Sequence, residues 1–319
     1  MSRRPATINA LRQGGKPALA RALSAVETER GSLMLAGFLD AAARAARATV
    51  LGLTGPPGVG KSTLTNALIQ ACRARGERVG VIAVDPSSQI TGGALLGDRT
   101  RLATDPEDDG VFVRSMAARD RLGGLSDDAI AAVVVMRAVM DRVIVESVGI
   151  GQSEADVAQV ADTLALCIQP GSGDSLQFMK AGVMELPDIV AVTKADMGAL
   201  ATRARADVAG ALTLTRPAGA GDLPEVVLVS AASGEGIAEF VDRCDRLGAE
   251  TVRCGARDRR RAEQQRHWVR DAITRRFGSV GLSLCAVDEM LAECPGPFSA
   301  IGALDQKMRE RLGLVVRLD

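Results

Sequence analysis

Short apolar runs alternate with longer amphipathic segments through the middle of the chain. Segments with a helical spacing of apolar residues, among them 62–75, 127–140 and 199–212, lie between most of the runs. Strands buried on both faces are continuously apolar, so this alternation predicts an α/β fold with a mostly parallel sheet covered by helices. The expected strands are residues 50–53, 79–84, 111–113, 143–145, 164–168, 189–192 and 226–229.

The pattern differs at the two ends of the chain. The first fifty residues predict two amphipathic helices, the first with Leu19, Leu23 and Val26 on one face. Beyond Gly234 the sequence is helical again, and residues 257–276 carry apolar residues only at intervals, so this helix needs a partner. We therefore expect an N-terminal helical extension (1–48), a central domain (49–247) and a C-terminal helical arm (248–319).

Composition narrows the classes of function. The chain has 319 residues, and 39 Lys and Arg balance 39 Asp and Glu, which argues against a generally basic nucleic-acid-binding protein. Six Phe, one Trp and no Tyr leave few rings for stacking bases. The N-terminus has no apolar signal-peptide core, and the longest apolar run, near residues 129–136, is too short to span a bilayer. We expect a cytoplasmic protein that binds neither nucleic acid nor membrane.

The strongest motif follows the first predicted strand and precedes a helical segment. Its pattern is Gly-x-x-x-x-Gly-Lys-Ser, the phosphate-binding P-loop. Glycines let backbone N–H groups point at phosphate oxygens, Lys61 supplies a positive charge, and the Ser62 hydroxyl can bind Mg²⁺. The nucleotide-binding residues predicted here are Gly55, Pro56, Pro57, Gly58, Val59, Gly60, Lys61, Ser62 and Thr63.

A magnesium site also needs a carboxylate at the end of a second strand. Asp85 ends one apolar run, and Glu146 ends another, three residues before Gly149. That spacing is typical of a γ-phosphate sensor, in which the acid handles the metal and the glycine N–H reaches the phosphate. Asp98, after a Gly-rich stretch, is a third candidate.

The base-binding residues are predicted after the last two strands. Thr193, Lys194 and Asp196 form a Thr-Lys-x-Asp sequence after one strand, and Ser230, Ala231 and Ala232 follow the next. A carboxylate at Asp196 can accept hydrogens from N1 and the 2-amino group of guanine, both of which adenine lacks. With adenine, the carboxylate would be left without these two donors, and each unpaired buried polar group costs about 1–3 kcal/mol. The pattern therefore favours GTP over ATP.

With these motifs, the chain resembles the MeaB/ArgK-type GTPases. The matching segments are residues 55–63, 84–88 (Val-Asp-Pro-Ser-Ser), 91–101, 145–154 (with Val-Gly-x-Gly-Gln-Ser-Glu) and 170–174. The resemblance implies a P-loop GTPase domain between helical extensions. It also implies a homodimer that binds GTP or GDP with Mg²⁺ and serves as a chaperone of adenosylcobalamin-dependent acyl-CoA mutases, chiefly methylmalonyl-CoA mutase. Members gate cofactor loading, or protect and reactivate the mutase, and hydrolyse GTP slowly until the mutase binds.

The resemblance also assigns roles to residues. It implies a first switch over residues 85–101, a second over 149–154 that includes Gln152, and a mutase-responsive loop over 171–180. Lys61, Asp85 and Glu146 are the expected catalytic residues, with Asp85 our candidate for orienting the attacking water. The implied Mg²⁺ ligands are Ser62, Asp85, Asp98 and Glu146, and the implied partner-responsive residues are Gln152, Asp174, Gln177 and Lys180.

The chain departs from the family pattern at Thr193, where Asn is usual. Threonine has one hydroxyl and no amide, so we expect weaker nucleotide affinity with guanine still preferred through Asp196. Ile150 stands directly after Gly149, where many GTPases have a glutamine, which favours low intrinsic turnover.

Two other functions share this fold class. A nickel-delivery GTPase would need clustered Cys or His ligands, whereas this chain has one histidine, His267, and six scattered cysteines. A P-loop small-molecule kinase or a transport-associated ATPase would leave the Lys-x-Asp and Ser-Ala-Ala sequences unexplained. We therefore expect the GTPase.

Overall fold

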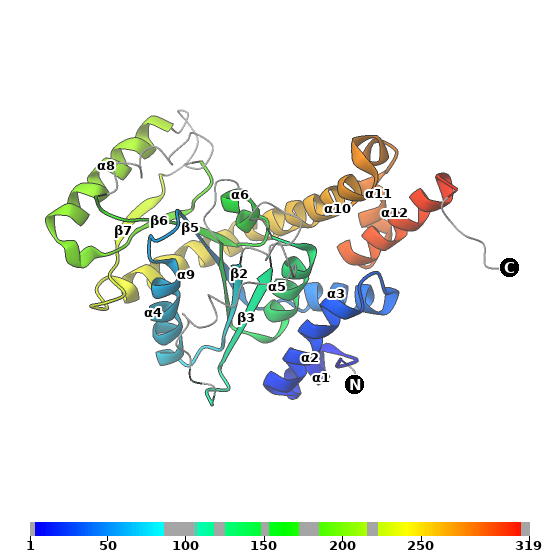
Figure 1. The fold of residues 1–319 in the computed structure, drawn as a ribbon, viewed down its shortest axis with the longest axis horizontal. Helices are drawn as coiled ribbons and strands as arrows, with labels where there is room; N and C mark the ends of the chain where they lie inside the picture. The colour runs from blue at the N-terminus through cyan, green and yellow to red at the C-terminus, as the bar shows by residue number, and fades with distance from the viewer. Residues whose placement is uncertain are drawn as a thin grey trace. The chain divides into compact units, whose positions relative to one another are not determined.

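A computed structural model describes residues 4–85, 105, 107–117, 125–147, 153–171, 185–215 and 223–313 (Figure 1). Its elements are α1 (Ile8–Gln13), α2 (Gly15–Thr28), α3 (Leu33–Arg44), β1 (Thr49–Thr54), α4 (Lys61–Ala74), β2 (Val79–Asp85), β3 (Val111–Ala117), α5 (Asp127–Val139), β4 (Arg142–Glu146), α6 (Ser153–Ala158), β5 (Thr163–Ile168), β6 (Ile189–Val192), the 3₁₀ turn η2 (Ala195–Met197), α8 (Ala199–Thr215), β7 (Glu225–Leu228), α9 (Ile237–Arg253), α10 (Ala256–Ser283), α11 (Val287–Glu293) and α12 (Pro297–Arg311).

The chain divides into two compact units. The sheet unit comprises Ala48–Val133 and Met140–Arg257. The helical unit comprises Met1–Arg47, Val134–Val139 and Asp258–Asp319, so it draws on both ends of the chain.

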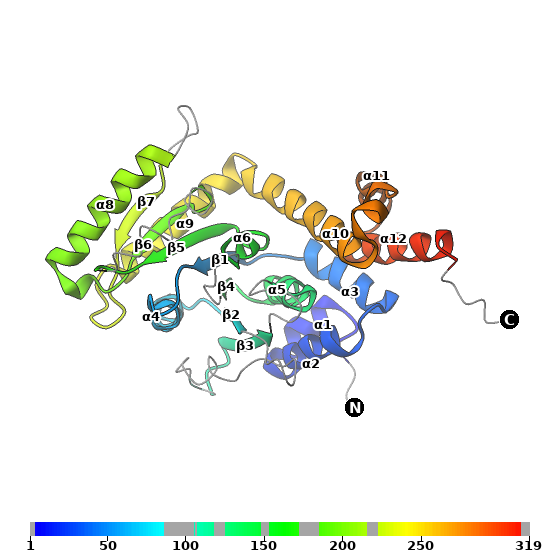
Figure 2. The same ribbon diagram turned by 45° about the horizontal axis from the view of Figure 1, so that its top comes forward.

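Within the described residues, seven strands form one sheet in the order β3-β2-β4-β1-β5-β6-β7, and every neighbouring pair is parallel (Figure 2). The predicted α/β fold with a parallel sheet is confirmed, and all seven apolar runs are strands. β3 continues to Ala117, beyond the predicted end at residue 113. β3 is an edge strand, and edge strands tolerate polar residues. Arg114 and Ser115 are polar and half-buried, and they interrupt the apolar pattern by which the strand was predicted.

Helices cover both faces of the sheet, as alternate residues along β1 show. Leu51 and Leu53 lie in the core cluster shared with α4 and α9. Gly52 lies on the opposite face of the sheet, where a Cβ added to it would be 2.5 Å from Cγ1 of Val157 in α6. A side chain at Gly52 would therefore overlap Val157, and the packing of α6 on this face would have to shift. α8 packs on the same face as α6, through Val208 and Leu212.

At the amino edge of the sheet, an aspartate stands directly before each of three strands. The Asp141 carboxylate accepts the backbone N–H of Arg78 at 2.8 Å. Asp162 accepts the N–H of Val50 at 2.9 Å, and Asp188 that of Leu164 at 2.8 Å. Each bond gives a side-chain acceptor to an N–H on the neighbouring strand or, for Arg78, directly before it, so each one also fixes where adjacent strands start.

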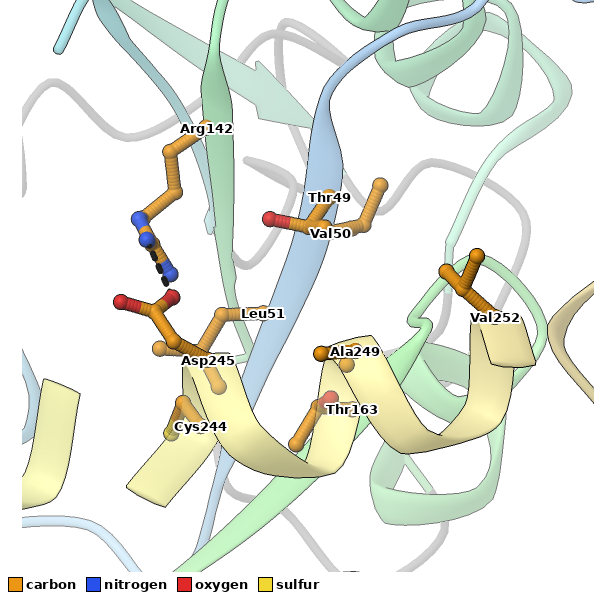
Figure 3. Close-up of a pocket in the computed structure, with 10 residues that line it drawn as sticks. Thr49, Val50, Leu51, Arg142, Thr163, Cys244, Asp245, Ala249 and Val252 are labelled. Atoms are coloured by element: carbon orange, nitrogen blue, oxygen red, sulfur yellow. Dashed lines mark hydrogen bonds and ion pairs between the residues drawn. The ribbon is translucent and has the colours of Figure 1, made fainter. Parts of the chain in front are cut away.

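The same edge carries an ion-pair network around the buried Arg142. The Arg142 guanidinium donates to Glu77 at 2.8 Å and to Asp245 of α9 at 2.6 Å. Burial lowers the pKa of Arg142, but the hydrogen bonds to these two carboxylates outweigh it and raise the pKa overall. Figure 3 shows Arg142 and Asp245 pointing toward each other beside a cavity of about 180 Å³ that Thr49, Thr163 and Gly248 help to line. Thr49, Arg142 and Thr163 begin β1, β4 and β5, so this cavity lies at the sheet edge opposite the P-loop.

In the helical unit, α10, α11 and α12 share a core that includes Val269, Ile273, Met290 and Leu304. Asp40 of α3 is fully buried, and its carboxylate accepts the N–H groups of Phe298 and Ser299 in the first turn of α12, each at 3.0 Å. An acidic side chain satisfies the free N–H groups at a helix N-terminus and complements its dipole. This one links the N-terminal and C-terminal segments.

The helical segments differ from their expected form at both ends. Three N-terminal helices are present in the described residues instead of two, because Thr7 caps the short α1 by accepting the N–H of Ala10. α10 contains non-helical backbone at Gly278 (φ 70°), so its last turns follow a break. No helix in the described part of the chain has the length and apolar character needed to cross a membrane.

We predict that Asp162→Ala lowers the free energy of unfolding by about 1–3 kcal/mol, since it removes the acceptor of the buried Val50 N–H. Asp162→Asn keeps a side-chain oxygen, so its effect should stay below about 1 kcal/mol. Urea unfolding followed by circular dichroism measures both. The matched control is Asp242→Ala, which removes a carboxylate from an exposed pair with Arg75. Equal losses for Asp162→Ala and Asp242→Ala would contradict the prediction.

Candidate nucleotide-binding site

The loop between β1 and α4 depends on glycine backbone geometry. Gly55, Gly58 and Gly60 have φ values of 140°, 75° and 97°, which L-residues with side chains rarely adopt. At Gly55 a Cβ would also lie 2.3 Å from the backbone oxygen of Cys167. The loop therefore lies directly against β5, and the site requires glycine at its first position. Burial raises the pKa of the Cys167 thiol to about 12, so this side chain is neutral beneath the loop.

Lys61 begins α4 and folds back over the loop. It is only 7% exposed, and its Nζ donates to the carbonyl oxygens of Gly55 at 2.7 Å and Pro56 at 3.0 Å. The ammonium group and the N-terminus of α4 both place positive charge at the loop. This is the arrangement that binds phosphate at a helix N-terminus.

Glu146 ends β4 and meets the first turns of α4. It is 4% exposed, the Ser62 hydroxyl donates to its Oε1 at 2.6 Å, and the Thr65 hydroxyl lies 3.0 Å from its Oε2. A carboxylate and a hydroxyl side by side are hard oxygen donors of the kind that Mg²⁺ prefers. Ala83 pairs with Glu146, which places the end of β2, at Asp85, along the same sheet edge.

These residues fit a magnesium ion held jointly with a nucleotide. Within the described residues, no group of three or more His, Cys, Asp or Glu side chains is assembled for a metal. Mg²⁺ usually binds through one or two protein oxygens together with water and substrate phosphates, so it needs no such group.

Thr193 braces the P-loop from the end of β6. Its hydroxyl lies 2.7 Å from the Val59 carbonyl oxygen and 3.1 Å from that of Ile168. The Ile168 oxygen already accepts the backbone N–H of Thr193 at 2.8 Å. The hydroxyl has one proton, so we assign it to the shorter bond with Val59. A threonine thus ties this strand to the P-loop.

The predicted base-binding residues come together beyond β6 and β7. Asp196 lies in η2 with an exposed side chain, and the buried Ser230 donates its hydroxyl to Asp196 Oδ1 at 2.6 Å. Ser230 Oγ in turn accepts the N–H of Ser233 at 3.2 Å, which fixes the serine rotamer. Lys194 has an unusual positive φ of 55°, and its Nζ donates to Gln169 Oε1 at 2.6 Å. Ala231 and Ala232 lie in the turn after Ser230.

The structure thus gathers the described members of the predicted site at the carboxyl edge of the sheet. Sequence reasoning missed Thr65 and Gln169, although each lies near a predicted motif. Several predicted residues fall outside the described residues: Asp98, Gly149, Gln152, Asp174, Gln177 and Lys180.

Comparisons with known proteins identify the family. A family model described as "Methylmalonyl Co-A mutase-associated GTPase MeaB" matches residues 19–280. The chain belongs to this family. A protein of Pyrococcus abyssi named as a GTPase is 42% identical over 240 residues, which cover 74% of this chain and 73% of the relative. The mitochondrial methylmalonic aciduria type A homolog of mouse is 36% identical over 226 residues, covering 70% of this chain and 54% of the relative.

Solved structures agree with this membership. A structure described as an LAO/AO transport system kinase is 26% identical with a TM-score of 0.69, and the match covers 96% of this chain and 93% of that one. HypB of Helicobacter pylori, solved in complex with nickel, is 18% identical with a TM-score of 0.51, covering 68% of this chain and 94% of that one. The second match shows a shared fold only. The predicted MeaB/ArgK-type resemblance is confirmed, and membership implies nucleotide binding at the P-loop.

We predict that Thr193→Val lowers nucleotide affinity about tenfold, because Val59 loses the donor that braces the loop. Thr193→Ser keeps the hydroxyl and should stay within about threefold of the parent protein. Equilibrium titration with a fluorescent nucleotide measures both. Equal affinities for the valine and serine variants would show that the hydroxyl does not brace the loop.

Proposed function

We propose that this member of the MeaB family binds GTP with Mg²⁺, hydrolyses it slowly, and acts as a chaperone of an adenosylcobalamin-dependent acyl-CoA mutase. The observation that carries the nucleotide assignment is the Asp196 carboxylate, oriented by Ser230 beyond a P-loop that Thr193 braces. A fixed carboxylate matches the two hydrogens that guanine presents and adenine lacks. The family description and the mouse relative support the mutase as partner.

The chemistry proposed for the site is mainly electrostatic. Lys61 and the N-terminus of α4 stabilise negative charge on the phosphates. Ser62 and Glu146 would hold Mg²⁺, with Asp85 and Asp98 as further ligands, and the ion would neutralise charge on the phosphates. Asp85 is our candidate for orienting the water that attacks the γ-phosphate. Since Ile150 replaces the usual glutamine, turnover without a partner should be low.

The proposal extends to assembly and switching. Gly149, Gln152, Asp174, Gln177 and Lys180 are proposed to respond to the nucleotide and the mutase, as the family pattern implies. The proposed assembly is a cytoplasmic homodimer of this chain, in which the C-terminal arm makes the contacts.

A second candidate is a transport-associated kinase, the activity for which the 26% identical structure is named. Phosphate accounting separates the two functions. A GTPase releases one inorganic phosphate for each GDP formed, whereas a kinase leaves phosphate on an amino acid or protein acceptor.

Guanine selectivity tests the nucleotide assignment. We predict that the protein binds GTP in preference to ATP, and that Asp196→Ala weakens GTP binding by about 10–100-fold with little effect on ATP. Isothermal titration with both nucleotides measures this. Asp207→Ala is the matched control, since Asp207 is an exposed carboxylate on the following helix, α8. Equal affinities of the parent protein for GTP and ATP would rule out the assignment.

Mutase dependence tests the partner. We predict that GTP turnover by the purified protein rises when an adenosylcobalamin-dependent acyl-CoA mutase of the same organism is added, because the partner completes a site that lacks a water-positioning glutamine. Phosphate release measures the rate, and Lys61→Ala should abolish it with and without mutase. If no acyl-CoA mutase of the organism changes turnover, the chaperone role fails while the GTPase assignment stands.

A further inference from the structure

Glu146 receives a separate hydroxyl at each of its two carboxylate oxygens. Ser62 donates to Oε1 at 2.6 Å, and the fully buried Thr65 lies 3.0 Å from Oε2. Ser62 and Thr65 are three residues apart, so adjacent positions on one face of α4 present them to the same side chain. Ser62 belongs to the P-loop motif, but neither that motif nor the family resemblance gives Thr65 a role.

We assign the Thr65 proton to the carboxylate. Its hydroxyl lies 3.0 Å from Glu146 Oε2 and also 3.0 Å from the Lys61 carbonyl oxygen, and one proton can serve only one acceptor. The Lys61 carbonyl is in the first turn of α4, where the helix already supplies the Thr65 backbone N–H as its donor. As a ligand of Mg²⁺ under the proposed function, the Glu146 carboxylate would be ionised, and hydrogen bonds to an ionised acceptor are about twice as strong as neutral ones.

The two hydroxyls have different tasks once a metal binds. Under the proposed function, the Ser62 hydroxyl and one oxygen of Glu146 would hold the magnesium ion. The Ser62 hydroxyl would then no longer fix Oε1. The Thr65 bond to Oε2 would not involve the metal, so it would continue to fix the rotation of the carboxylate.

We propose that Thr65 is a positioning residue for the magnesium ion: it holds Glu146 by Oε2 so that Oε1 stays aimed at the Ser62 side. β-Branching supports this role, because a threonine in a helix has few side-chain rotamers. The carboxylate is thus oriented before the ion arrives, and little ordering remains to be done on binding. The inference rests on the proposed binding of GTP with Mg²⁺.

The test measures how much Mg²⁺ strengthens nucleotide binding. For each variant, the dissociation constant of a fluorescent GTP analogue is measured in EDTA and in excess Mg²⁺, and the ratio of the two is compared. Thr65→Val and Thr65→Ala remove the hydroxyl and should reduce the ratio by about tenfold or more, whereas Thr65→Ser should stay within about threefold of the parent protein. Affinity in EDTA should change little for all three.

Thr251→Val is the matched control, since Thr251 in α9 also bonds a helical carbonyl, that of Gly248 at 2.9 Å, and has no such role at the site. Its ratio should equal that of the parent protein. Both constants report only molecules that bind nucleotide, so a partly unfolded preparation does not alter the ratio. A parent-like ratio for Thr65→Val, or a serine variant as deficient as valine, overturns the inference. If the parent protein does not bind the GTP analogue even in excess Mg²⁺, the proposed function itself fails.

Discussion

A carboxylate taken out of water must be hydrogen-bonded, and Glu146 meets this requirement with side chains from the first two turns of α4. Those bonds fix the start of α4 against the end of β4. β4 is paired with β1 through its whole length, up to Leu53, so the loop between β1 and α4 is held at both ends. The glycines at 55, 58 and 60 let a backbone confined in this way turn without strain, and Lys61 closes over it.

Carboxylates lie at both edges of the sheet, but they make different contacts at each edge. A parallel sheet has no hairpin turns to set strand register, so other contacts must do so. Asp141, Asp162 and Asp188 provide them at the amino edge by binding backbone N–H groups of neighbouring strands. At the carboxyl edge, Glu146 and Asp196 are held by hydroxyls, and they lie at the P-loop and at the predicted base-binding residues. The carboxylates of the amino edge thus fix the fold, whereas those of the carboxyl edge are oriented at the proposed nucleotide site.

The fold could be predicted because a parallel sheet buried on both faces leaves continuous apolar runs, and these mark every strand to within a few residues. The edge strand β3 was predicted too short because Arg114 interrupts its pattern. Motifs located the P-loop, Glu146 and Asp196. Thr65 could not be found in this way, since a threonine inside a helix looks like a weak helix former until the carboxylate beside it is visible. Likewise, the Asp40 cap of α12 joins residues more than 250 positions apart, and no local pattern encodes such a contact.

The hydroxyl at Thr193 shows how the chain departs from its family and keeps the geometry. Bracing the P-loop needs one donor, and the threonine supplies it to Val59 while its backbone N–H satisfies Ile168. The asparagine usual at this position has two donors on its amide, so the substitution retains the brace and removes a second possible bond. Under the proposed function, guanine recognition would then depend more heavily on the carboxylate of Asp196, which Ser230 and Ser233 hold through a relay of two hydrogen bonds. The threonine at the end of β6 would therefore increase the importance of the contact between Asp196 and Ser230, which follows β7.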